Sequence, residues 1–518
     1  MRYRCLFLTA LLIGSSTTGC DDPRVYVGDD SDALTVLCRR GGDCGKVMHA
    51  ANKLDLLLVV DDSQSMEQEQ AALAAELPRM MTALLTGDID GDGTPEVAPV
   101  EDIHVGVVST DMGLGELDGV VENCSGLGDN GALLAGGEGM AECSPPPHNF
   151  LQYDADSPHD NAAAELGCLA SLGIKGCGFE QQLESALKAL TPSDSEIEFW
   201  SPSGPIASGQ GDAINAGFLR NDPSDPSLIA VILITDEDDC SSRDYSHFAP
   251  GASSSGLNTR CHFESMRGEA SNIYATQRYV DGLRALRPDH DNLVFFGAIT
   301  GVPLAPVSAD ELAKIDFADD AERDAFYDDL LAHPDMQEKV NDMGTPDVPE
   351  DDGIAPVCSV TNGRAYPARR IVEVARGFGS NSMVQSICQE TFASAIEPIL
   401  QRMAASFSGA CVNAAIDRSD NGKVACDVLW RLPDVSVAGV PATCDDASFL
   451  SRAGENRPAN VCRVAQLPSD DGAPVGDGWY YDDFSERTRW CDGETKQAIV
   501  FTGEARPPSE VTILIDCD

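Results

Sequence analysis

Three oxygen-bearing side chains at alternate positions follow an apolar run near the start of the chain. Residues 56–60 are all Leu or Val, which is typical of a strand buried on both faces of a parallel sheet. Asp61, Ser63 and Ser65 come next, and a helical apolar pattern begins at Met66. A carboxylate and two hydroxyls on a strand-to-helix turn favour a hard cation over softer metals. Alone, the same residues could simply cap the helix.

A second apolar run ends in the same way. Residues 228–235 read LIAVILIT, and Asp236 follows them directly. In doubly wound α/β folds, ligands bind at the carboxyl ends of the strands.

Together, D-x-S-x-S after the first strand and Asp236 after the second resemble the metal-ion-dependent adhesion site of von Willebrand factor type A (vWA) domains. The resemblance implies that Asp61, Ser63 and Ser65 are direct or near-direct ligands of Mg²⁺ or Mn²⁺. It implies that Asp236 contacts the metal directly or through a water. It also implies that a carboxylate from a partner protein completes the coordination shell.

The sequence departs from the family pattern at three places. Gln64 stands where glycine is common, and three acidic residues at 237–239 follow Asp236 where a glycine is usual. The family threonine, normally in a G-G-T turn before a helix, is not obvious. The equivalent turn spans residues 176–181, where Glu180 or Gln181 could supply the missing oxygen.

A separate acidic run predicts a possible calcium loop. Asp88, Asp90 and Asp92 alternate before Gly93, as in the first half of a calcium-binding loop, and Glu96 follows. The twelfth position is proline, so this is not a proper EF-hand. The alternative is a solvated acidic turn without a metal.

Alternating strand and helix patterns predict the fold class of the central region. We expect residues 53–408 to form a vWA-type, Rossmann-like α/β domain: a doubly wound, mostly parallel sheet with long loop insertions. From residue 409 the chain becomes rich in cysteine and in short strand-like runs. Residues 409–518 are therefore expected to form a small, disulfide-rich, β-rich module.

The beginning of the chain has the features of an export signal. Residues 1–20 combine two arginines, a short apolar core and Thr18-Gly19-Cys20, which resembles the end of a bacterial lipobox. We expect Cys20 to be lipidated, the alternative being ordinary cleavage and secretion. Residues 21–52 are then expected to form an acidic tether. No other segment is long and apolar enough to span a membrane.

The cysteine content agrees with an oxidising compartment. Of 18 cysteines, Cys5 lies in the signal and Cys20 would carry lipid, which leaves 18 − 2 = 16, an even number. Spacing suggests local disulfides, although sequence does not decide the connectivity. The suggested pairs are Cys38–Cys44, Cys124–Cys143, Cys168–Cys177 and Cys240–Cys261.

Charge and motifs narrow the class of function. The formal charge is −50, from 35 basic and 85 acidic residues, which opposes binding to nucleic acid or anionic lipid. No P-loop, G-x-G-x-x-G, H-E-x-x-H or G-x-S-x-G motif occurs, so we do not expect an enzyme.

The leading interpretation is a lipid-anchored envelope protein, at the outer membrane or cell surface, that binds a partner protein through the metal. Two alternatives stay open. One is a structural scaffold that metal and disulfides stabilise. The other is a carbohydrate- or cell-wall-binding or hydrolytic protein acting through residues 409–518, where Trp479-Tyr480-Tyr481 could form a sugar-binding platform.

Overall fold

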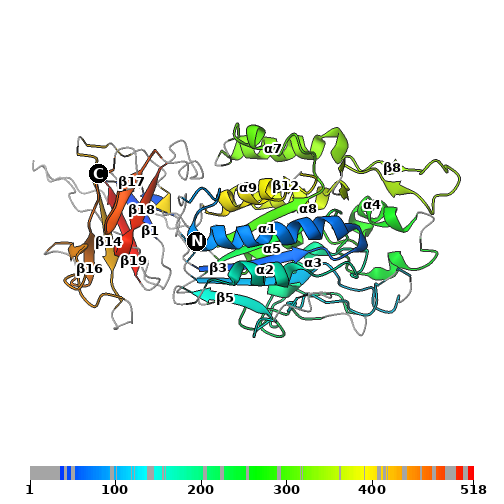
Figure 1. Ribbon diagram of the computed structural model, residues 1–518, viewed down its shortest axis with the longest axis horizontal. Coiled ribbons are helices and arrows are strands. Elements are labelled where there is room, and N and C mark those ends of the chain that lie inside the picture. The colour runs from blue at the N-terminus through cyan, green and yellow to red at the C-terminus, as the bar shows by residue number, and fades with distance from the viewer. Residues whose placement is uncertain are drawn as a thin grey trace, which may run out of the picture.

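The computed structural model describes residues 35–39, 44–47, most of 53–404 and most of 410–517. Inside these ranges the undescribed residues are 94–98, 101, 118–119, 122, 137–144, 155–156, 158, 202–206, 222–226, 253–255, 289–292, 316, 318, 361–362, 390, 412–415, 417, 420, 434–439, 455–457, 470–473, 485–496 and 506–510. An α/β body and a β-rich body lie side by side along the longest axis (Figure 1).

A six-stranded sheet forms the centre of the α/β body, with the order β12-β7-β6-β3-β4-β5. All neighbours are parallel except the edge strand β5, which runs antiparallel to β4. Every residue of β6 and β7 is buried, as continuous apolar runs in a covered parallel sheet require. The strands are β3 (Lys53–Val60), β4 (Asp102–Ser109), β5 (Phe150–Asp154), β6 (Leu228–Ile234), β7 (Val294–Thr300) and β12 (Ser382–Ser386).

Two groups of helices pack on this sheet and share its apolar core. In the first group, α1 (Glu67–Thr86) contacts α2 (Ala162–Ala170) and α9 (Ala393–Ala404). In the second, α5 (Gln277–Arg284) contacts α3 (Gln182–Leu190) and α8 (Arg369–Gly377). Helix α7 (Asp320–Ala332) packs outside α8, and α4 (Arg260–Ser265) and α6 (Ala309–Leu312) lie in insertions.

The strand order defines where a ligand would bind. Counted along the chain, the sheet strands lie in the order 3-2-1-4-5-6, from β5 to β12, which is the common doubly wound order. Its switch point lies between β3 and β6, where successive connections leave in opposite directions. Val60 pairs with Ile234 at that point, so the residues that follow both strands meet there.

Long insertions decorate the sheet, as the sequence predicts. The connection from β7 to α8 carries two small hairpins: β8 (Val340–Asn341) with β9 (Gly353–Ile354), and β10 (Cys358–Val360) with β11 (Gly363–Ala365). Short 3-10 helices complete this body: η1 (Gln64–Met66), η2 (Tyr245–Phe248), η3 (Leu257–Thr259), η4 (Gly268–Ala270), η6 (Pro334–Met336) and η7 (Gly379–Asn381).

The second body is built from two mostly antiparallel sheets of short strands around its own apolar cluster. A six-stranded sheet has the order β15-β16-β14-β19-β1-β2, and a three-stranded one the order β13-β18-β17. The bounds are β13 (Ala410–Cys411), β14 (Cys426–Arg431), β15 (Leu450–Arg452), β16 (Val461–Val464), β17 (Gly478–Asp482), β18 (Ala498–Thr502), η9 (Gly503–Ala505) and β19 (Thr512–Cys517).

The expected tether at residues 21–52 needs a correction. Two of its segments, β1 (Thr35–Arg39) and β2 (Cys44–Val47), are strands of the C-terminal sheet, and β1 pairs in parallel with β19. In Figure 1 the blue β1 lies among the red and orange strands. The module therefore includes both ends of the described chain. Pairing with β1 covers the edge of β19 that would otherwise be exposed.

Disulfides test the suggested cysteine pairs. Cys240–Cys261 is confirmed, whereas Cys124 bonds to Cys177, so the pairs Cys124–Cys143 and Cys168–Cys177 are wrong. The error arises because the fold brings distant insertions together, and sequence proximity does not measure this. Cys38 lies opposite Cys44 in the β1–β2 register. Two further bonds are Cys358–Cys388 and Cys444–Cys462.

Within the described residues, none of the helices combines the length and the apolar character needed to cross a bilayer. Residues 1–20, with Cys20, lie outside the described residues.

Candidate metal centre

Asp61 is fixed at the switch point by both neighbouring strands. Its backbone N–H donates to Ile234 O (3.0 Å), which extends the β3–β6 pairing by one residue. Its carboxylate accepts the Ser63 N–H (2.9 Å) and the Thr235 hydroxyl (2.7 Å). The Gln70 amide donates to the Asp61 carbonyl (2.7 Å), so α1 also holds the turn. Asp61 is 0% exposed, and its carboxylate has a defined orientation.

The two sequence motifs meet through Ser65. The hydroxyls of Ser63 and Ser65 lie 2.9 Å apart, and Ser65 Oγ donates to Asp236 Oδ1 (3.1 Å). Ser63 also hydrogen bonds to the Asp61 carboxylate. These four side chains therefore form one continuous set of oxygen atoms, which reaches solvent at the exposed Ser65. The spatial neighbourhood that the spacing predicts is present.

Glu180 is brought to the same place. Its backbone carbonyl accepts the Cys240 N–H (2.9 Å), which fixes the turn before α3 next to the segment that follows β6. Its buried side chain hydrogen bonds to Glu237, so a proton must be held between these two carboxyls. Burial, then Glu237, Asp61 and Asp236, raise the pKa of Glu180 well above its ordinary value.

Gln181, the alternative to Glu180, has another role. Its amide donates to the Tyr245 hydroxyl (2.8 Å) and accepts the Ser242 N–H (3.1 Å). Its backbone N–H donates to Thr110 O (3.1 Å). These bonds tie the insertion after β6 to the edge of the sheet, and they leave Glu180 as the residue of this pair that faces the acidic site.

The cluster is strongly acidic and its carboxyl groups repel one another. Burial, followed by Asp61, Glu237 and Glu69, raises the pKa of Asp236 to about 9. Burial and then Asp61 raise the pKa of Glu237 to about 7. Burial also raises the pKa of Asp61. Burial is the largest cause of each shift, and neighbouring carboxylates add to it at Asp236 and Glu237.

The acidic run after β6 is divided between two roles. Asp236 and Glu237 face the cluster, whereas Asp239 forms an ion pair with Arg370 (3.1 Å). Asp238 accepts the backbone N–H of Arg370 (3.0 Å), close to the start of α8. The second half of the run therefore anchors α8, and it does not add charge to the metal centre.

Glu69 is a member of the cluster that the sequence analysis missed. It is buried on the first turn of α1, and Gly363 packs directly against its carboxylate. Its Oε2 has no hydrogen-bond partner in the described part of the chain. Tyr366 N–H donates to Asp236 O (2.8 Å), so the β11 segment closes over this side. The spacing of four residues from Ser65 places Glu69 on the same helix face, which was the available signal.

The donor set fits a hard divalent cation. The four linked side chains, Asp61, Ser63, Ser65 and Asp236, all offer oxygen atoms. Neighbouring carboxylates add negative charge that is not compensated. Such oxygens suit Mg²⁺, Mn²⁺ or Ca²⁺, and a cation would relieve the repulsion that raises these pKa values. These residues include no thiolate or imidazole group, which are the ligands that softer metals prefer.

The possible calcium loop lies elsewhere, after the carboxyl end of α1. Carboxylate oxygens of Asp88, Asp90 and Asp92 all lie within 4.8 Å of one another. Asp88 accepts the N–H groups of Gly91 (2.7 Å) and Gly93 (2.8 Å), as in an ordinary acidic turn. The cluster therefore does not by itself indicate bound calcium, and Glu96 lies outside the described residues.

The aromatic triplet of the C-terminal module has no exposed face. Trp479, Tyr480 and Tyr481 are 0%, 2% and 2% exposed and belong to β17. The interpretation of these rings as a sugar-binding platform is wrong, because alternation on a strand covered on both sides buries all three.

Comparisons with known proteins do not assign the chain. None of the known protein-family models matches this sequence. No curated protein shows significant similarity to it either. The functional argument therefore depends on the residues themselves and their geometry.

Proposed function

We propose that this chain is an exported vWA protein that binds a partner protein through a divalent cation. Asp61, Ser63, Ser65 and Asp236 would hold the cation, Mg²⁺ or Mn²⁺, and Glu180 would contribute on the side of α3. The observation that carries the proposal is the Ser65–Asp236 hydrogen bond, which joins the two motifs at the switch point of the sheet. The strand order and the uncompensated charge support it.

The open side of the site is consistent with recognition of a protein ligand. Asp61 and Asp236 are buried, whereas Ser65 reaches the surface. When bound, the cation would supply an open coordination position for a carboxylate. Without it, a partner's carboxylate would meet a cluster of buried carboxyl groups instead of a cation, so binding should depend strictly on the metal.

The disulfides support export. Four bonds between described cysteines suit an oxidising compartment and are rare in cytosolic proteins. Lipidation at Cys20 would then hold the protein at the outer membrane or cell surface, and cleavage without lipidation would release it. The anchor would be the protein's contact with lipid.

A binding experiment with a chelator tests the proposed function. The purified protein is immobilised and presented with proteins of the cell surface and medium, in Mg²⁺ or in EDTA. We expect specific partners to be retained in Mg²⁺ and lost in EDTA and in Asp61→Ala. Asp90→Ala is the matched control, since it removes a carboxylate from the distant acidic turn and should retain the partners.

A different result would replace this function. Partners that stay bound to Asp61→Ala in EDTA would show that the metal does not mediate binding. A folded protein that binds metal but retains no partner would favour the structural scaffold.

A further inference from the structure

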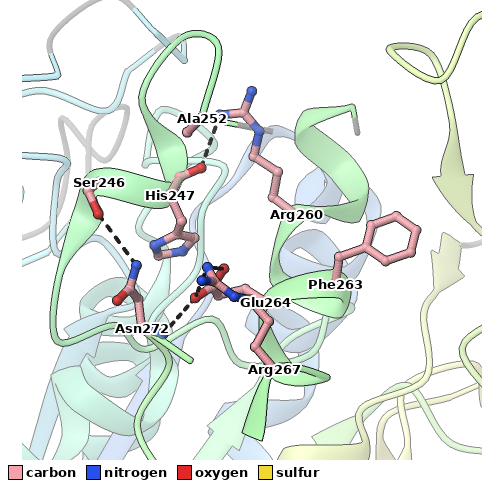
Figure 2. A pocket seen from close by; sticks show the side chains of 8 residues that line it. All are labelled: Ser246, His247, Ala252, Arg260, Phe263, Glu264, Arg267 and Asn272. Carbon is pink, nitrogen blue, oxygen red and sulfur yellow. Dashed lines mark hydrogen bonds and ion pairs between the residues drawn. The ribbon is translucent and has the colours of Figure 1, made fainter. Parts of the chain in front are cut away.

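A second candidate site lies in the insertion after β6, between η2 and α4. It is a cavity of about 240 Å³, called here the Arg267 pocket (Figure 2). The Cys240–Cys261 disulfide joins α4 to the segment that follows β6, so the pocket is attached to the body covalently. Its lining residues are Ser246, His247, Ala252, Arg260, Phe263, Glu264, Arg267 and Asn272.

Arg260 forms one wall of the pocket and has unused hydrogen-bonding capacity. Its Nη1 donates to the carbonyls of His247 (3.3 Å), Phe248 (2.6 Å) and Ala249 (3.3 Å). These bonds fix the guanidinium while it is only 9% exposed. Its Nε is buried and has no partner among the residues that the structure describes, which is costly for a cationic donor.

Arg267 supplies the second cation. Its Nη1 donates to both oxygens of Glu264 (3.2 and 2.9 Å), and Figure 2 shows its side chain folded back over that carboxylate. Within the described part of the chain, Nε and Nη2 of Arg267 have no partner, and the side chain is 54% exposed. Glu264 also accepts the Asn272 N–H (2.7 Å), so its acceptor capacity is largely used inside the protein.

The remaining polar groups do not balance these donors. His247 is held by its Nδ1 contact to Asp244 O (2.9 Å), and burial lowers its pKa, which leaves the ring neutral at pH 7. Ser246 and Asn272 add a hydroxyl and an amide at one end. The lining therefore contains two guanidinium groups and one carboxylate, which gives it a positive excess in a chain with a net charge of −50.

We propose that the Arg267 pocket binds a small ligand through an oxyanion: a carboxylate, sulfate or phosphate group. Planar guanidinium donors match such groups, and the cavity is too small for more than a compact molecule. The hydroxyl and amide of Ser246 and Asn272 would contact the ligand's polar substituents. Phe263, which Figure 2 shows turned away from the other lining side chains, forms the rim.

This site is separate from the metal centre in residues and in chemistry. A hard cation and an oxyanion require opposite charge, so neither site can substitute for the other. Binding to the Arg267 pocket should therefore persist in EDTA and in Asp61→Ala. Failure of the metal proposal would leave this inference intact, and the reverse also holds.

Isothermal titration tests the proposal with three probes: sodium sulfate, sodium phosphate and sodium glucuronate, each at matched ionic strength in EDTA. We expect saturable binding of at least one anion, and an increase in Kd of about tenfold or more in Arg267→Ala. Arg376→Ala is the control, because Arg376 is also an exposed arginine paired with a carboxylate, Asp328 (2.7 Å). The tightest probe would distinguish a planar carboxylate from a tetrahedral group.

A second variant gives an effect of the opposite sign. Glu264→Gln retains an oxygen for the Asn272 N–H and removes the internal carboxylate that competes for Arg267. It should tighten anion binding several-fold, which a purely structural role for these residues would not produce. The proposal is overturned if none of the three anions saturates. It is also overturned if Kd is the same in wild type, Arg267→Ala and Glu264→Gln.

Discussion

Two buried aspartates at opposite ends of β3 have very different surroundings. Asp55, near the amino end, is 0% exposed and accepts hydrogen bonds from the Arg220 side chain (2.7 Å) and backbone (2.9 Å). Ser227 donates to it as well, and Arg287 lies 3.7 Å away. Asp61, at the carboxyl end, is equally buried but is surrounded by hydroxyls and other carboxylates.

The difference separates a structural charge from a functional one. A buried charge is stable only when it is paired or coordinates a metal. The Asp55 cluster is complete because arginines from the chain supply the positive charge. The Asp61 cluster lacks that charge, and a bound divalent cation would supply it. An aspartate at one end of the strand is therefore structural and an aspartate at the other end is functional, and the neighbouring residues determine which role each has.

The largest predicted effect comes from making the Asp55 end resemble the Asp61 end. Arg220→Met leaves the Asp55 carboxylate buried without its closest cation, so the free energy of unfolding should fall by about 3–5 kcal/mol. Urea denaturation measures this. Arg376→Met, at an exposed ion pair, should change it by less than about 1 kcal/mol. Equal effects in the two variants would show that Asp55 depends on its arginine no more than an exposed ion pair does.

The stability of the metal-free protein should depend on pH because of the buried carboxyl groups around Asp61. In the folded protein the pKa of Asp236 is about 9, whereas the ordinary value is 3.8, so the folded state binds more protons between these pH values. Stability in EDTA should therefore fall as pH rises from 5 to 8, by about 4 kcal/mol. Thermal melts across this range measure it, and excess Mg²⁺ should stabilise more at pH 8 than at pH 5. Stability that rises with pH in EDTA would contradict this electrostatic description.

Neutralising one member of each cluster should give opposite signs. Asp236→Asn removes the cost of protonating this buried carboxyl group on folding, and its amide oxygen can still accept the Ser65 hydroxyl. In EDTA at pH 7.5 it should raise the free energy of unfolding by about 1–3 kcal/mol, whereas Asp55→Asn should lower it. Chemical denaturation compares them directly. Destabilisation by both substitutions would mean that Asp236 is a structural residue like Asp55.

The smallest effect is expected at the exposed acidic turn. Asp90→Asn removes one carboxylate from the group of Asp88, Asp90 and Asp92, all at least partly exposed, and retains an acceptor for the Asp92 N–H. Without metal, its unfolding free energy should change by less than about 0.5 kcal/mol. A calcium-induced rise in Tm that disappears in this variant would show that the turn is a metal site after all.

The parts of the molecule with strong local signals were predictable. The apolar runs of β3 and β6 predict buried parallel strands, and such strands bring Asp61 and Asp236 to one edge. The turn before α3 placed Glu180 near them. These predictions succeed because the apolar pattern identifies the strands and the topology brings their carboxyl ends together. Neither step requires knowledge of side-chain contacts.

The remaining features depend on contacts between distant segments. From the sequence, Glu69 is an ordinary acidic residue at a helix start, and only the structure shows that Gly363 packs against it. Likewise, β1 looks like part of a tether in the sequence, and only the structure shows that it pairs with β19. Cys124 reaches Cys177 because two insertions meet above the sheet. Local spacing carries no information about such contacts, which is why Cys124–Cys177 and the full acidic cluster were missed although Cys240–Cys261 was predicted.

The most direct test of the central claim is a titration of the EDTA-stripped protein with Mn²⁺, with free Mn²⁺ followed by electron paramagnetic resonance. We predict one saturable site in the wild type that Mg²⁺ displaces, that survives in Asp90→Asn, and that is lost in Asp61→Ala. Mn²⁺ binding that is absent from the wild type, or unchanged in Asp61→Ala, would contradict the assignment of a metal centre to the carboxyl end of β3.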